Sequence, residues 1–224
     1  MRFQDAAKDA RTVVYAGIQA DPLVARVAEL LMTAAPAERW LARAVMNGQR
    51  TEPEVWRRIF PALFGEAAPA ARDRAERLLQ ACLEVASKGE QARSSFRGAI
   101  VEELTARLLA ARSAAAPAPV KRERRVLFDG VPAEIHPYDV TVESAQRPEV
   151  YDCKWGARGI NADVLNQLDD ARSNAAAEEV ELRVALVIFD AQRSCEIRLA
   201  RQTARRDRTE LVAIESIDRL AARS

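Results

Sequence analysis

The chain has 224 residues, and its 34 Lys and Arg against 33 Asp and Glu give a formal net charge of +1. This balance carries no global signal for a polyanionic partner, so a nucleic-acid surface would have to be a local basic patch. The sequence contains no leader pattern and no stretch of roughly 20 apolar residues, which predicts a cytoplasmic protein without a membrane span. Three widely separated cysteines argue against disulfides and a zinc site.

The first part of the chain, up to about residue 86, is predicted to be entirely helical. Apolar residues recur at helical spacing in four stretches, which begin near Asp21, Pro36, Thr51 and Ala70. Stripes of this kind form the core of a helical bundle. Residues 87–90 have the composition of a hinge, so we predict a helical domain at 1–88 that contacts a protein partner, a substrate or a second copy of the chain.

The remainder, residues 89–224, mixes helical and β-rich patterns. In chain order these predict a helix at 96–112, a linker at 113–119, strands at 125–128, 138–143 and 149–155, a helix at 162–177, a strand at 182–189, a short strand at 211–215 and a terminal helix at 217–222. The continuous apolar run at 182–189 is typical of a buried strand. The alternation of strands and helices predicts an α/β domain.

Two strands of this domain carry a pattern of charged side chains. Alternate residues of a strand share a face, so Asp152 and Lys154 are expected to point the same way. A hairpin through residues 144–148 would bring Asp139 on the preceding strand close to Asp152. Two carboxylates and an ammonium on one face are costly to bury unless a cation lies between the acids. The pattern therefore predicts a site for Mg²⁺, with Mn²⁺ as a substitute, because both take oxygen ligands.

This pattern resembles the PD-(D/E)xK nuclease superfamily over residues 95–189. Asp139 matches the first acid, and Asp152-Cys153-Lys154 matches the (D/E)xK tripeptide. The chain departs from the pattern at the position before Asp139, where Tyr138 stands in place of proline. The resemblance implies a restriction-endonuclease-like αβββαβ core beside the N-terminal helical domain.

The resemblance also implies a set of metal ligands. Asp139 and Asp152 would bind the ion, and the backbone carbonyl of Cys153 would add a third oxygen. The preceding helix would supply a glutamate as a ligand or as a hydrogen-bond partner of a metal-bound water. The Gly98 spacing in that helix favours Glu102, whereas helical angle leaves Glu103 as the alternative.

Two further residues would assist catalysis. Lys154 would steady the attacking water or the transition-state charge, since a lysine beside two carboxylates stays protonated and does not act as a base. Gln167, in the helix that follows, resembles the polar residue that some superfamily members place at the metal site.

Basic residues near the site would contact phosphates. Arg122 and Arg125 belong to a cluster at 121–125, Arg158 lies four residues after Lys154, and more arginines occur at 193–208. The sequence therefore predicts a Mg²⁺-dependent nuclease that acts on DNA, with a bacterial defence or restriction role by family analogy. The alternative is a non-catalytic interaction protein that retains the nuclease fold.

Overall fold

The computed structural model describes residues 1–7, 10–113, 118–132, 136–202 and 209–222. The chain divides into two compact units, which we call the sheet unit (residues 1–9 and 105–224) and the helical unit (residues 10–104). The division falls inside α7 (Glu90–Ser113), between Leu104 and Thr105. This differs from the predicted boundary at 88/89, because α7 is one continuous helix and the first residues of the chain join the sheet.

In the helical unit, the helices from α2 to α6 each begin at a proline. Its elements besides the first part of α7 are α1 (Ala10–Gln19), α2 (Pro22–Met32), α3 (Pro36–Asn47), α4 (Pro53–Ile59), α5 (Pro61–Phe64) and α6 (Pro69–Ala86). Proline suits the first helical position, because that residue needs no backbone N–H and its φ is already helical. α6 packs against α2 and α3, with Leu31, Val45 and Leu79 buried in the core. The helices predicted for this part of the sequence are confirmed, but the stretch from Thr51 divides into α4 and α5 and leaves Ile59 exposed.

The sheet unit contains a mixed sheet whose strands are ordered β1-β2-β4-β5-β6-β7, with β3 paired to β2. The strands are β1 (Arg2–Asp5), β2 (Val120–Phe128), β3 (Val131–Pro132), β4 (Tyr138–Val142), β5 (Glu149–Lys154), β6 (Arg183–Ile188) and β7 (Glu210–Ala213). Pairing is antiparallel from β1 to β5 and parallel from β5 to β7. The predicted α/β class is confirmed.

Strand β5 lies between helices. On one side, Arg112 and Thr105 of α7 contact Glu149 and Cys153. The alternate residue Val150 belongs to a buried cluster with Val126, Leu186 and Ile188 and with residues of α8 (Ala162–Ala177). Because Asp152 and Lys154 alternate with Cys153, they follow Val150 on the second side of the strand. The fold thus places the two charged residues at the carboxyl end of a central strand.

Several elements differ from the predictions at the ends of the chain. β1 was predicted to be helical, but it forms a strand because Phe3 pairs with Val126 of β2. The helix α9 (Gln192–Ala200) was not predicted, since it buries little more than Cys195 and has no apolar stripe to reveal it. The predicted terminal helix is a 3₁₀ turn, η3 (Ile217–Leu220).

Candidate functional site

The predicted acid pair meets where the β4–β5 ladder ends. Val140 pairs with Tyr151, so Asp139 before it and Asp152 after Tyr151 lie at the same end of the hairpin. Lys154 Nζ lies 3.7 Å from Asp139 Oδ2 and forms an ion pair with Asp152 Oδ1. The structure therefore brings Asp139, Asp152 and Lys154 together, as the strand pattern predicted.

Asp139 is held in place by a backbone group of the neighbouring strand. The Cys153 N–H donates to Asp139 Oδ2 at 2.6 Å. The Asp139 carboxylate thus accepts a hydrogen bond from the backbone of β5 beyond the point where β4 and β5 are paired. A charged acceptor makes such a bond strong. The Cys153 side chain is buried, with Sγ 3.6 Å from Thr105 Oγ1. Cys153 is therefore a core residue on its side-chain face, and the metal-ligand role of its carbonyl stays a prediction.

Asp152 is the more buried acid. The residue is only 7% exposed, and its Oδ1 is the oxygen that forms the ion pair with the Lys154 ammonium. The Lys154 ammonium is thus the charged partner of the Asp152 carboxylate.

Lys154 is protonated at neutral pH. Burial acts to lower the pKa of Lys154, but the charges of Asp139 and Asp152 outweigh it and hold the pKa well above its ordinary value of 10.5. The three side chains together carry one positive and two negative formal charges.

Glu102 belongs to the helical unit and is also buried, at 4% exposure. Tyr15 Oη donates to its Oε1 at 2.5 Å, and Gln19 Nε2 donates to its Oε2 at 2.8 Å. Gly98 makes room for this contact, because a Cβ at that position would lie 3.0 Å from Tyr15 Oη. Glu103 is half-buried. The predicted metal role of Glu102 stays a prediction, and Tyr15 and Gln19 were not identified from the sequence.

Gln167 makes two contacts near the start of β4. Its side-chain Nε2 donates to the His136 backbone carbonyl at 3.1 Å, and its backbone carbonyl accepts from Tyr138 Oη at 3.2 Å. These bonds tie α8 to the residues directly before Asp139. Gln167 therefore supports the hairpin that carries the first acid, while its predicted place at a metal stays a prediction.

The three predicted phosphate contacts differ in exposure. Arg158 is exposed on the 3₁₀ turn η1 (Ala157–Gly159), whereas Arg122 and Arg125 are half-buried on β2. Two other members of the cluster are neutralised: Lys121 lies 3.1 Å from Glu143, and Arg124 bonds both Glu143 and Asp5. Of the predicted C-terminal arginines, Arg205, Arg206 and Arg208 lie outside the described residues.

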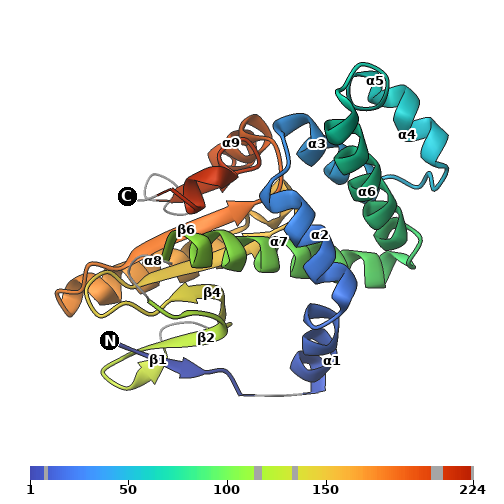
Figure 1. The fold of residues 1–224 in the computed structure, drawn as a ribbon. Coiled ribbons are helices and arrows are strands. Elements are labelled where there is room, and N and C mark those ends of the chain that lie inside the picture. The colour runs from blue at the N-terminus through green and yellow to red at the C-terminus, as the bar shows by residue number, and fades with distance from the viewer. Residues whose placement is uncertain (8–9, 114–117, 133–135, 203–208, 223–224) are drawn as a thin grey trace. The chain divides into compact units, whose positions relative to one another are not determined.

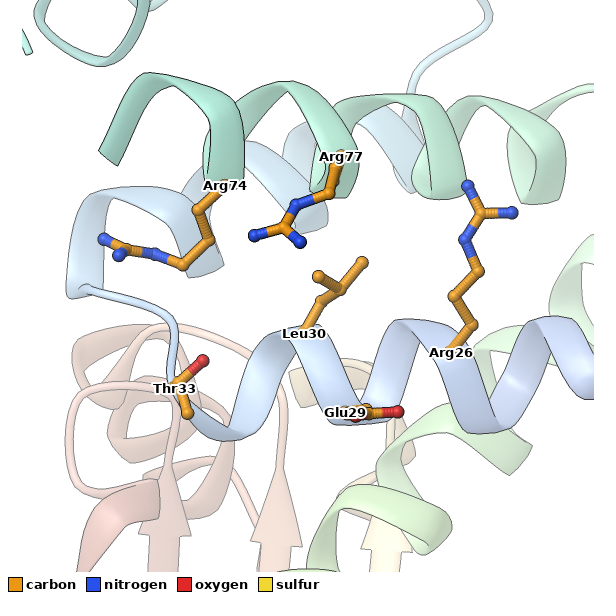
Figure 2. A pocket seen from close by; sticks show the side chains of 6 residues that line it. All are labelled: Arg26, Glu29, Leu30, Thr33, Arg74 and Arg77. Carbon is orange, nitrogen blue, oxygen red and sulfur yellow. The ribbon is translucent and has the colours of Figure 1, made fainter. Parts of the chain in front are cut away.

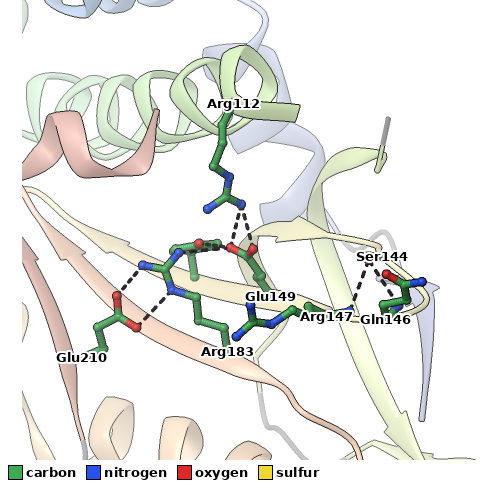
Figure 3. A network of polar contacts seen from close by, with 8 residues as sticks. Arg112, Ser144, Gln146, Arg147, Glu149, Arg183 and Glu210 are labelled. Atoms are coloured by element: carbon green, nitrogen blue, oxygen red, sulfur yellow. Dashed lines mark hydrogen bonds and ion pairs between the residues drawn. The ribbon is translucent and has the colours of Figure 1, made fainter. Parts of the chain in front are cut away.

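A second polar cluster occupies the start of β5 (Figure 3). Glu149 accepts from Arg112 at 2.8 Å and from Tyr151, and Arg183 contacts both Glu149 and Glu210. Burial, reinforced by the Glu149 carboxylate, raises the pKa of Tyr151, so its phenol stays protonated. Two arginines balance two glutamates here. The cluster aligns β5, β6 and β7 and leaves no net charge for a ligand.

The helical unit has a shallow cavity of about 450 Å³ between α2 and α6 (Figure 2). It is lined by Arg26, Glu29, Leu30, Thr33, Arg74 and Arg77. Two of its arginines are paired with acids, Arg26 with Glu84 at 3.0 Å and Arg74 with Glu38 at 2.8 Å. Because these acids offset the arginines, we assign no ligand to the cavity.

The acids at the β4–β5 site are a pair and not a larger cluster. Among the described residues, no group of three or more His, Cys, Asp and Glu side chains is placed to hold a metal ion.

No helix in the same part of the chain is both long enough and apolar enough to cross a membrane.

No family model matches the chain, and no curated protein matches it. A similar solved structure is that of protein VC1899 from Vibrio cholerae, with 15% sequence identity and a TM-score of 0.41. The alignment covers 98% of this chain and 56% of that chain, so the chain spans little more than half the length of that structure. A TM-score of this size assigns neither a fold family nor a function.

Proposed function

We propose that the chain is a metal-dependent nuclease that hydrolyses phosphodiester bonds of DNA at Asp139, Asp152 and Lys154. The observation that carries the proposal is the convergence of two carboxylates on one lysine ammonium, where β4 begins and β5 ends. The order of α7, the strands β2, β4 and β5, α8 and β6 supports a restriction-endonuclease-like αβββαβ core, to which the two-residue strand β3 is an addition beside β2.

The residues present fit a divalent metal. Mg²⁺ prefers oxygen ligands and keeps several of its waters, so it is often held by only one or two carboxylates. Asp139 and Asp152 supply two carboxylates at the same end of the β4–β5 pair. When bound, the ion would lower the pKa of a water and stabilise charge on the phosphate oxygens. Glu102 remains a candidate additional ligand.

Cys153 and Lys154 would position the metal ligand and the attacking water. The N–H of Cys153 holds Asp139 in position. The ammonium of Lys154 would orient the attacking water and stabilise negative charge that develops on the phosphate. Its raised pKa excludes it as a general base at neutral pH, so the proton of the water would leave to solvent or to a phosphate oxygen.

DNA contact would come from arginines of η1 and β2. Arg158 is exposed and lies on the short turn η1, four residues after Lys154, so it is the best-placed phosphate contact. Arg122 and Arg125 would contribute from β2. A role as a bacterial defence or restriction effector follows from the family resemblance and is proposed with it.

The proposal is tested by incubating the full chain with supercoiled plasmid and with single-stranded DNA in Mg²⁺, in Mn²⁺ and in EDTA. Metal-dependent cleavage is expected, and Asp139→Asn should abolish it. Asp163→Asn serves as a matched control, since Asp163 is an exposed carboxylate in the first turn of α8. Cleavage that persists in Asp139→Asn would show that another site, or a contaminant, is responsible.

The second candidate is a non-catalytic interaction protein that retains this fold. It is favoured by the ion pairs themselves, because Lys154 partly neutralises both acids without a metal. Calorimetric titration with Mn²⁺ separates the two. Heat of binding that disappears in Asp139→Asn supports the nuclease, whereas the absence of binding and of cleavage supports the interaction protein.

A further inference from the structure

We propose that the turn η1 is a clamp that aims the Lys154 side chain at the two acids, with Gly159 as its contact point and Asp190 and Arg198 as its anchors. These three are positioning residues, since they act through Lys154. The proposal deepens the nuclease function and its kinetic part rests on that function, but the packing of the turn on the lysine can be tested separately.

The contact between Gly159 and Lys154 is close enough to exclude any side chain at position 159. A Cβ added there would lie 2.7 Å from Cγ, 2.8 Å from Cβ and 2.9 Å from Cδ of Lys154. These atoms form the base of the lysine stem, which cannot move aside in the way that a flexible end can. The absence of a Cβ at Gly159 therefore lets the turn lie directly on the stem.

The turn is anchored at both ends by groups from outside it. At its start, the Ala157 N–H donates to Asp190 Oδ2 at 2.9 Å. The other oxygen of Asp190 accepts from the Ala191 N–H at 2.8 Å, which fixes the carboxylate. At its end, Arg198 Nε of α9 donates to the Ile160 carbonyl at 3.0 Å. The turn is thus tied to the end of β6 and to α9.

The backbone of Lys154 is fixed as well. The Phe189 N–H donates to the Lys154 carbonyl at 2.9 Å, so the parallel pairing of β5 and β6 extends to this residue. A lysine side chain has many rotamers when it is unrestrained. With its backbone held by β6 and its stem covered by Gly159, Nζ is restricted to the region between Asp139 and Asp152, where the structure places it.

The kinetic test compares Gly159→Ala with Gly89→Ala, a matched control because a Cβ at Gly89 would meet nothing within 4 Å. Displacement of a catalytic group by about 1 Å can cost roughly 100-fold in rate, so Gly159→Ala should lower kcat by that order with little change in KM. Gly89→Ala should keep the wild-type kcat. Arg198→Gln, which removes an anchor and adds no clash, should lower kcat by a smaller factor.

The decisive comparison uses the double variant. If Gly159 acts through Lys154, then Gly159→Ala should cost no further activity in a chain that already carries Lys154→Ala. A full additional loss in the double variant, or wild-type kcat in both Gly159→Ala and Arg198→Gln, would overturn the proposal.

A stability cycle gives the answer if the chain cleaves no DNA. Gly159→Ala should lower the urea midpoint of unfolding, and the loss should be smaller beside Lys154→Ala, which removes the Cγ and Cδ contacts. Equal losses in both backgrounds would overturn the clamp itself. Coupled stability without any cleavage would retain the clamp and reject the nuclease.

Discussion

Both ends of strand β5 carry acidic and basic side chains, but in different proportions. At its start, Glu149 and Glu210 are matched by Arg112 and Arg183, and the charges cancel (Figure 3). At its end, two aspartates share one lysine. A balanced cluster with several hydrogen bonds contributes to stability. The difference between the two ends fits the proposal that the second end binds a cation.

The largest expected effect is on cleavage by Asp152→Asn. A metal ligand is worth several kcal/mol of transition-state stabilisation, so the variant should lose roughly 1000-fold or more in kcat/KM. Its stability should change much less than its activity, because Lys154 keeps Asp139 as an acidic partner and no buried charge is left alone. Cleavage assays and urea unfolding of the same preparation check both. An unchanged cleavage rate would reject the site assignment.

Glu149→Gln at the other end should show the reverse pattern. Loss of that carboxylate leaves Arg112, only 9% exposed in its side chain, without its acid. Breaking a buried pair costs about 3 kcal/mol, so the variant should unfold at lower urea concentration. Its affinity for Mn²⁺, measured by calorimetry, should match that of the wild type. Lost metal affinity with unchanged stability would reverse the roles given to the two ends.

Lys154→Met should separate binding from chemistry. The side chain keeps its apolar stem under Gly159 but loses the ammonium, so DNA affinity should stay near the wild-type value while kcat falls roughly 100-fold. Filter binding in Ca²⁺ and cleavage in Mg²⁺ give the two quantities. A normal kcat with weaker DNA binding would instead make Lys154 a phosphate contact.

Alkaline pH should act on the lysine end of the strand. Because the folded-state pKa of Lys154 is raised, its contribution to stability is fully present below its ordinary pKa of 10.5 and is lost as pH rises through the folded value. The difference in urea midpoint between wild type and Lys154→Met should therefore be constant from neutral pH to about pH 9. A difference that already declines between pH 7 and 9 would contradict the raised pKa.

The smallest expected effect comes from the surface. Arg158→Glu should weaken DNA binding for all sequences alike and reduce the slope of log affinity against log salt by about 0.9 for each phosphate that the protein no longer neutralises. Arg72→Glu on α6 is a matched exposed control. Equal reductions in the two variants would show that the effect is one of total charge and not of position.

The sequence was most informative where side-chain period decides the structure. The strand alternation of Asp152 and Lys154 and the short connection before Glu149 predicted the hairpin that brings Asp139 to them. The strand β1 escaped prediction because only its pairing with β2 makes it a strand. The contacts of Gly159 with Lys154 and of Tyr15 with Glu102 were not predicted, because no local sequence pattern indicates them.

The most direct test of the metal site is anomalous diffraction from crystals of the full chain soaked in Mn²⁺, with a nucleotide monophosphate as a substrate mimic. We predict an anomalous peak at coordination distance from both Asp139 and Asp152. Occupied Mn²⁺ positions elsewhere, with the Lys154–Asp152 pair intact and no peak at the two acids, would contradict the proposal.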